Sequence, residues 1–77
     1  MKYQIEILPL AGHFVVALKN PAGEPVKVFT VNASAAEILR LYRDGLDIEA
    51  IAHTLSDKYG VPIDRVRIDA ELLLHKL

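Results

Sequence analysis

The residue types that most often carry out chemistry are present in this chain, but they are not grouped in catalytic patterns. His13, His53 and His75 stand far apart, with no pair at helical i, i+4 spacing and no carboxylate at ligand spacing. Neither Ser34 nor Ser56 lies in a nucleophile motif, and the glycines occur singly, so no phosphate-binding loop is present. We therefore expect a protein that is not an enzyme, with no catalytic residue, no metal and no cofactor.

Charged residues near the C-terminus allow two interpretations. Asp64, Asp69 and Glu71 spread around a predicted helix and, with Arg65 and Arg67, form a solvated face. The two arginines also stand near the start of the helix that a winged helix-turn-helix protein places in the DNA major groove. The acidic neighbours and a net charge of −1 do not give the one-sided positive surface typical of DNA readers. DNA binding is therefore an alternative function that the sequence does not favour.

Length and composition describe one small domain. Seventy-seven residues predict a single domain, 1–77, that is too small for a large enclosed active site. Because the chain has no cysteine, its stability must come from the core, and 52% apolar residues make that feasible. No apolar run reaches the length of a membrane span and the first residues do not form a signal peptide. A cytoplasmic protein without a membrane partner is the expectation.

The first part of the chain has the pattern of β-strands. Three segments are rich in alternating or β-branched residues: 3–7, 13–18 and 26–31. Pro9 and Gly12 are expected to bracket the first turn, and residues 20–23 (NPAG) predict a tight second turn between antiparallel strands. In the middle strand, Val15 and Ala17 are apolar on the face opposite to the core, which suggests that this second face is also partly covered.

The second part has helical periodicity in three segments. The first begins at a capping box from Ser34 to Glu37, with Asn32 as a competing N-cap, and ends at Gly45. The second runs from Asp47 to about residue 59, and the third begins near Pro62. Short links between the helices favour a compact helix-turn-helix unit packed under the sheet. The predicted class is α+β, a three-stranded antiparallel sheet followed by three helices, winged helix-turn-helix-like.

The last helix carries more apolar surface than one core needs. Residues 66, 70, 73 and 77 share one stripe, whereas Ile68 and Leu72 point away from it, flanked by Arg65 and Asp69. Ile68 and Leu72 either close over another part of the same chain or line a groove or a dimer contact. The strand 26–31 raises a related possibility, because an edge strand can receive a peptide as an added strand. Lys27 on it is most simply a solvated charge that blocks aggregation.

Four segments of the sequence resemble the PqqD family, which is named for a pyrroloquinoline quinone (PQQ) biosynthesis protein, and the related recognition elements of ribosomally made, modified peptides. The segments are 31–39 (VNASAAEIL), 47–52 (DIEAIA), 59–61 (YGV) and 66–73 (VRIDAELL). The resemblance extends over nearly the whole chain. Its motifs are caps, apolar spacings and turns, so they specify the fold better than the function. Two departures are Pro62-Ile63-Asp64 at the start of the last helix, where the family commonly has an acidic N-cap followed by Pro, and Leu73 where it usually has Phe.

The resemblance implies a peptide chaperone. Such domains bind the leader of a precursor peptide as an added strand beside the third strand and against the third helix, and present it to a modifying enzyme, often a radical SAM enzyme. The implied binding residues are Val26, Lys27, Val28, Phe29, Thr30, Val31, Arg65, Ile68, Asp69 and Leu72. Besides DNA binding, the remaining alternative is a small structural or regulatory subunit that forms a homodimer through Ile68 and Leu72.

Overall fold

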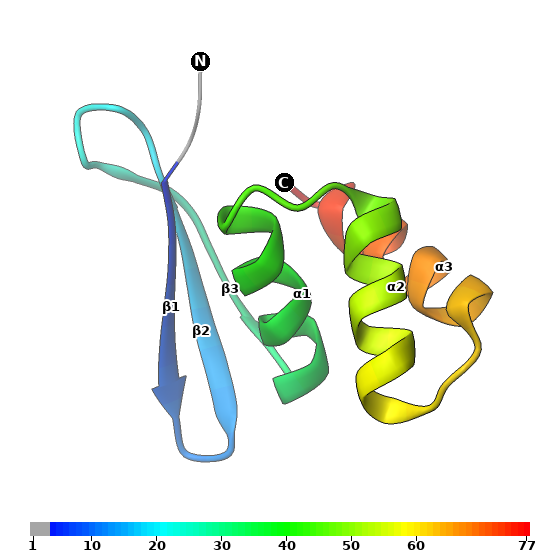
Figure 1. Cartoon of the computed structure of the whole chain (residues 1–77). Helices are drawn as coiled ribbons and strands as arrows, with labels where there is room; N and C mark the ends of the chain where they lie inside the picture. The colour runs from blue at the N-terminus through cyan, green and yellow to red at the C-terminus, as the bar shows by residue number, and fades with distance from the viewer. Residues whose placement is uncertain (1–3) are drawn as a thin grey trace. The chain divides into compact units, whose positions relative to one another are not determined.

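The computed structural model describes residues 4–77 and has the predicted α+β class. Three strands come first, β1 (Gln4–Leu10), β2 (His13–Lys19) and β3 (Pro25–Val31), and three helices follow, α1 (Ala33–Arg43), α2 (Ile48–Tyr59) and α3 (Ile63–Leu74) (Figure 1). Tyr3, the first residue of the predicted first strand, lies outside the described residues. The chain divides into two compact units, residues 1–37 and 38–77, so that α1 begins in the first and ends in the second.

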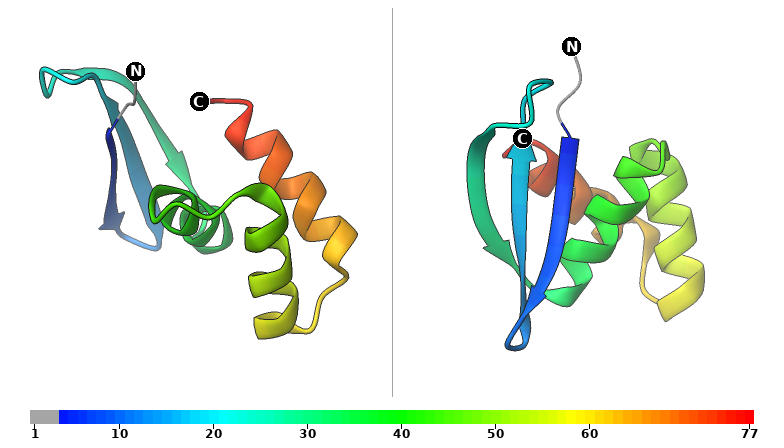
Figure 2. Two further views of the ribbon diagram at one scale, coloured as in Figure 1. Left: turned by 45° about the horizontal axis from the view of Figure 1, so that its top comes forward. Right: turned by 90° about the vertical axis from the view of Figure 1, so that its left-hand side faces the viewer.

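The sheet of the first unit is an antiparallel meander in the order β1-β2-β3, with β2 central (Figure 2, right). Ile7 lies opposite Val16, and Val16 lies opposite Phe29. Because successive side chains alternate between faces, these residues share one face with Leu18, and Val16 and Leu18 on it are buried. The sheet therefore has one face in the core, as the alternation predicts.

The two hairpin turns differ from each other in how well the sequence predicts them. The second is as expected, because the N–H of Gly23 donates to the carbonyl oxygen of Asn20 (2.9 Å), and the side chain of Asn20 accepts from the N–H of Ala22 (3.0 Å). The first turn is shorter than predicted. Pro9 does not bracket it but lies within β1 opposite Phe14, which an edge strand permits because its missing N–H can face away from the ladder.

The second unit buries one apolar stripe from each helix. The stripes consist of Ile38 and Leu39 on α1, Ile51, Ala52 and Leu55 on α2, and Val66, Ala70 and Leu73 on α3. Leu77, which the helical periodicity placed on the α3 stripe, lies beyond the end of that helix. Helix α2 has the expected caps, with the Asp47 side chain accepting from the N–H of Ala50 (2.8 Å) and Gly60 in the left-handed region at φ +66°.

At the start of α1, Asn32 is the N-cap and the predicted capping box of Ser34 is wrong. The side chain of Asn32 accepts from the N–H of Ala35 (2.9 Å), and its carbonyl accepts from the N–H of Ala36 (3.0 Å). Ser34 lies inside the helix. The competing cap two residues earlier therefore defines the helix start, because an asparagine there satisfies the third N–H of the helix directly.

Candidate peptide-binding surfaces

Strand β3 is an edge of the sheet. It pairs with β2 on one side, and no strand among residues 4–77 pairs with its other side. Val26, Lys27, Val28 and Thr30 are exposed, whereas Phe29 and Val31 are half-buried on the core-facing side. The Lys27 ammonium lies 5.9 Å from the centre of the Phe29 ring. This strand thus offers an exposed edge of seven residues that carries mainly β-branched side chains.

The hairpin positions this edge. The turn at residues 20–23 returns the chain antiparallel to β2, and the pairing shifts register between Leu18 and Lys19, opposite the start of β3. Pro25 begins the strand, a position that suits a residue without an N–H. The remainder of β3 keeps regular pairing from Lys27, opposite Leu18, to Val31, opposite Phe14. The edge is therefore regular over the segment that the sequence predicts to bind a peptide.

On α3 the four predicted residues form one exposed stripe. Arg65, Ile68, Asp69 and Leu72 follow one another at spacings of three, one and three, which places them on one side of a helix. Ile68 is 57% exposed and Leu72 is 64% exposed, while their neighbour Leu73 is 7% exposed. Ile68 and Leu72 are therefore not part of the core. Of the two interpretations that the sequence left open, the structure favours an exposed apolar surface over one that is covered by the same chain.

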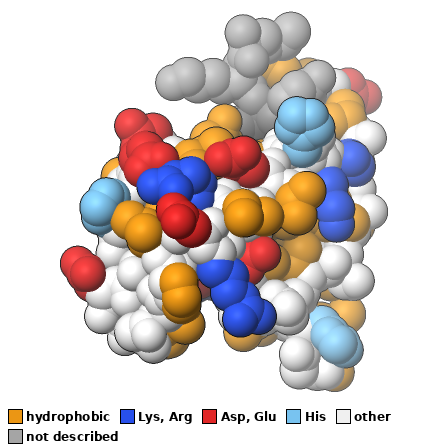
Figure 3. Space-filling model, turned by 90° about the vertical axis from the view of Figure 1, so that its right-hand side faces the viewer, with side chains coloured by type: hydrophobic (Ala, Val, Ile, Leu, Met, Phe, Trp, Pro, Cys, Tyr) orange, Lys and Arg blue, Asp and Glu red, His pale blue; other side chains and the backbone are white. Residues whose placement is uncertain are grey.

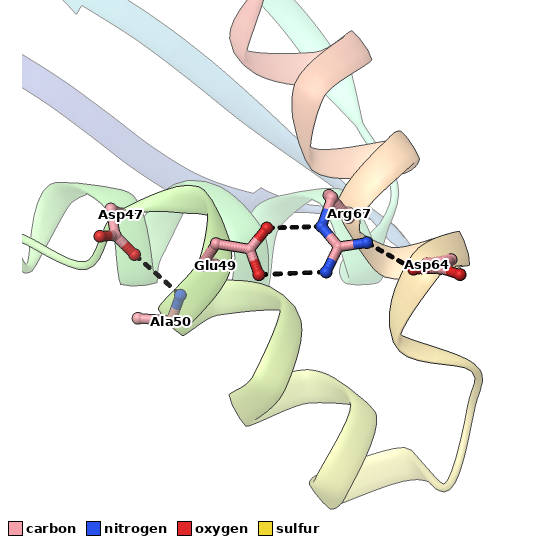
Figure 4. A network of polar contacts seen from close by, with 5 residues as sticks. All are labelled: Asp47, Glu49, Ala50, Asp64 and Arg67. Atoms are coloured by element: carbon pink, nitrogen blue, oxygen red, sulfur yellow. Dashed lines mark hydrogen bonds and ion pairs between the residues drawn. The ribbon is translucent and has the colours of Figure 1, made fainter.

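A polar network links the first two turns of α3 to the first turn of α2 (Figure 4). Arg67 donates through Nε to Glu49 Oε1 (2.5 Å) and through Nη2 to Glu49 Oε2 (3.0 Å), and its third nitrogen contacts Asp64. The hydrogen bond from Arg67 lowers the pKa of Glu49, and its bonds to Glu49 and Asp64 raise the pKa of Arg67. This exposed bidentate pair links α3 to α2 beside the packed stripes of the two helices.

Helix α3 begins without a side-chain cap, and Asp64 in its first turn takes part in the network with Arg67. Pro62 occupies the N-cap position without a side-chain hydrogen bond, whereas its carbonyl accepts from the N–H groups of Arg65 (3.1 Å) and Val66 (3.3 Å). Asp64 in the first turn is favourably placed for the helix dipole and also binds Arg67. Sequence reasoning assigned Asp64 and Arg67 to a solvated face and missed their link to Glu49, because this partner lies 18 residues from Arg67 in the chain.

Neither the histidines nor the acidic residues form a metal-binding group within residues 4–77. His13, His53 and His75 are exposed in separate elements. Figure 3, which looks onto the side of the molecule where α2 and α3 lie, shows acidic and basic side chains adjoining one another with separate apolar side chains nearby. This face does not have the continuous positive surface of a DNA reader. In the described part of the chain, no helix is long and apolar enough to cross a membrane.

The ten predicted site residues therefore fall on two surfaces. Six lie on β3 in the first unit and four lie on α3 in the second. Each set is contiguous within its own element. Their joint role as one binding site stays a prediction.

These features define a class of protein, a winged helix-turn-helix-like α+β fold with an exposed sheet edge and an exposed helix stripe. The sequence model of the family described as coenzyme PQQ synthesis protein D (PqqD) matches residues 13–77, so the chain belongs to the PqqD family, as its sequence resemblance indicated. Among solved structures, TbiB1 in complex with the TbiA(beta) leader peptide is similar in fold. The TM-score is 0.70 at 22% sequence identity, covering 100% of this chain and 87% of that one. No curated protein matched the sequence.

Proposed function

We propose that this chain binds the leader of a ribosomally synthesised precursor peptide and presents it to a modifying enzyme. Membership of the PqqD family supports this function, as does the fold shared with TbiB1, a protein whose structure was solved with a leader peptide. The single observation that carries the proposal is the exposure of Ile68 and Leu72, two large apolar side chains one turn apart on α3. Solvent exposure of such a pair is unfavourable unless a partner covers it.

The main-chain part of the mechanism is strand addition at β3. An extended leader would lie beside Val26, Lys27, Val28, Phe29, Thr30 and Val31 and continue the ladder that β2 begins. Main-chain hydrogen bonds at a sheet edge give affinity that depends little on sequence. Such binding requires no movement of the hairpin, because the edge strand is already regular from Lys27 to Val31.

The α3 stripe would determine which peptide sequences bind. Apolar leader side chains would cover Ile68 and Leu72, and polar ones would contact Arg65 and Asp69 at the rim of the groove. Arg65 donates and Asp69 accepts hydrogen bonds, so the rim can read both signs of charge. In this proposal a leader would use both β3 and α3, and residues 1–77 would act as one recognition domain.

The partner enzyme would carry out the chemistry. Residues 4–77 contain no grouped metal ligands, and the proposed role requires only binding and release. The family resemblance points to a radical SAM enzyme as the modifying partner and to a pathway of the PQQ type. We further propose that both proteins meet in the cytoplasm, where a precursor peptide is made.

The proposed function is tested by titration with a defined peptide. The probe is a synthetic candidate leader peptide, for which the TbiA(beta) leader seen with TbiB1 is the available example, and the control is the same peptide in scrambled order. We expect one leader per chain by calorimetry, with amide shifts in a nitrogen-15 spectrum concentrated on residues 25–31 and 63–74. A leader that binds no better than its scrambled form, or that shifts other residues only, would refute the proposal.

The same preparation tests the DNA-binding alternative. Mixing the chain with duplex DNA at low salt should give no affinity that rises steeply as salt is removed, because nine basic residues are balanced by ten acidic ones. A steep salt dependence together with no leader binding would favour a DNA-binding regulator.

A further inference from the structure

The sheet face opposite to the core carries an exposed apolar band. Leu8 lies opposite Val15, and Ala17 lies opposite Val28, so these four side chains share this face, together with Leu10 two residues beyond Leu8. Leu8 is 52% exposed, and Leu10 and Val28 are each 59% exposed. The band runs diagonally from the end of β1 across β2 to the middle of β3. Val15 and Ala17, which lie on the face opposite to the core, form the middle of this band.

The charged side chains on this face pair with each other, so the face offers no excess charge to attract a highly charged partner. Glu6 and Lys19 lie on it, and they form an ion pair of 2.9 Å with each other. The remaining polar side chains of the face are Gln4, His13 and Thr30. The charges of Glu6 and Lys19 compensate each other, so these two residues do not cause like-charge repulsion between two copies of the face.

The area suits a weak contact between two copies. From the exposed fractions of Leu8, Leu10 and Val28, the band presents on the order of 300 Å² of apolar surface, which is within the range of the largest apolar patch on a small protein, and such patches are often functional. Two facing bands would bury about 600 Å² of apolar area, and at the usual apolar share of an interface this corresponds to about 1,000 Å² in total. That total lies at the lower limit for a specific interface and predicts a dimer that dissociates readily.

We propose that this face, formed by Leu8, Leu10, Val15, Ala17 and Val28, is a self-association surface on which a second copy of the chain packs sheet against sheet. Sheets stack about 10 Å apart through their side chains. This contact uses no main-chain group of a sheet edge, so the β3 edge of each copy stays open. Val28 belongs to both surfaces, but a leader would bind the main-chain groups of β3, which the sheet-to-sheet contact leaves open, so the dimer would present two edges.

Sedimentation velocity between about 10 μM and 1 mM protein tests the proposal. The weight-average mass of the wild-type chain should rise from 8.6 kDa toward twice that value as concentration increases. The Leu8→Glu variant should stay at 8.6 kDa at every concentration. The matched control is Leu72→Glu, which introduces the same charge at a similarly exposed leucine on α3 and should associate like the wild type.

A measurement without any substitution complements these variants. In nitrogen-15 spectra of the wild-type chain, the amides that shift with protein concentration should be those of β1 and β2 around Leu8, Val15 and Ala17. A constant mass up to the highest concentration would overturn the proposal. Loss of association in the Leu72→Glu variant would also overturn it, because the contact would then be the α3 stripe. Concentration-dependent shifts confined to the β3 edge would overturn it as well.

Discussion

Leu72 and Leu73 are adjacent leucines on α3. Replacing each with alanine should distinguish a residue that binds the leader from one that stabilises the fold. Leu72 is 64% exposed and Leu73 is 7% exposed. Leu→Ala at a buried site costs about 2–5 kcal/mol of unfolding free energy, because transfer energy is lost and a cavity remains. Only about a third of Leu72 is covered, so the same change there should cost less than about 1 kcal/mol.

The two variants should rank in the opposite order for peptide binding. If a leader covers Leu72, removing its side chain loses about 2 kcal/mol of apolar burial. Since every 1.4 kcal/mol changes the dissociation constant tenfold, Leu72→Ala should weaken leader binding about 30-fold. Leu73→Ala removes no surface that a leader contacts, and its dissociation constant should stay within about threefold of wild type for the folded protein.

Thermal unfolding by circular dichroism and leader binding by fluorescence anisotropy measure the two quantities. For a domain of this size, 1 kcal/mol shifts Tm by about 4–8 °C, so Leu73→Ala should lower Tm by about 10 °C or more and Leu72→Ala by only a few degrees. If Leu72→Ala lowers Tm as much as Leu73→Ala does, Leu72 belongs to the core. If it leaves the leader affinity unchanged, the peptide does not lie on α3. Ile68→Ala should behave like Leu72→Ala.

Three further substitutions test local features. Asn32→Ala should lower the unfolding free energy by about 1 kcal/mol in urea titrations, whereas Ser34→Ala should not lower it, and equal losses would restore Ser34 as the cap. Ala11 has φ +45°, in the left-handed region that asparagine adopts more readily than alanine. Ala11→Asn should therefore raise the unfolding free energy by about 1 kcal/mol, and a decrease would show that the backbone of Ala11 is not strained. Because the hydrogen bond from Arg67 lowers the pKa of Glu49, this pair stabilises the fold above the unfolded carboxyl pKa of about 4.3 and loses that effect as pH falls through the lower folded pKa. The stability difference between wild type and Arg67→Gln should therefore be present at pH 7 and shrink in acid, and a difference independent of pH would show that the ion pair is not its source.

Sequence periodicity predicts the elements and the core because both depend on spacing along the chain. The stripe of Val66, Ala70 and Leu73 is buried where a helical repeat places it, and Asp47 caps α2 through the atoms that its position requires. Competition between two good local signals is harder to resolve. Asn32 and Ser34 are both strong N-cap residues, and the helix starts at the earlier of them.

Features that depend on distant residues are not visible in the pattern. Arg67 has acidic neighbours along its own helix, but its bidentate partner is Glu49 on α2. Pro9 reads as a turn residue until the pairing shows that β1 is an edge strand, where a missing N–H is tolerated. The exposure of Leu8 and Leu10 was also missed, although Val15 and Ala17 signalled an apolar second face on the strand beside them.

The surplus apolar residues of this small chain separate into two surfaces with different geometry. A helix stripe with apolar side chains one turn apart, such as Ile68 and Leu72, fits a single extended chain, because such a chain is narrow and contacts only a few side chains on its way past. A diagonal band across three strands, from Leu10 to Val28, is wider and fits another sheet. If each surface has its own occupant, Leu72→Glu must abolish leader binding while leaving self-association intact, and Leu8→Glu must do the reverse. A variant at one surface that changes both measurements would mean that a single occupant covers both, and the two roles would then have to be assigned to one interface.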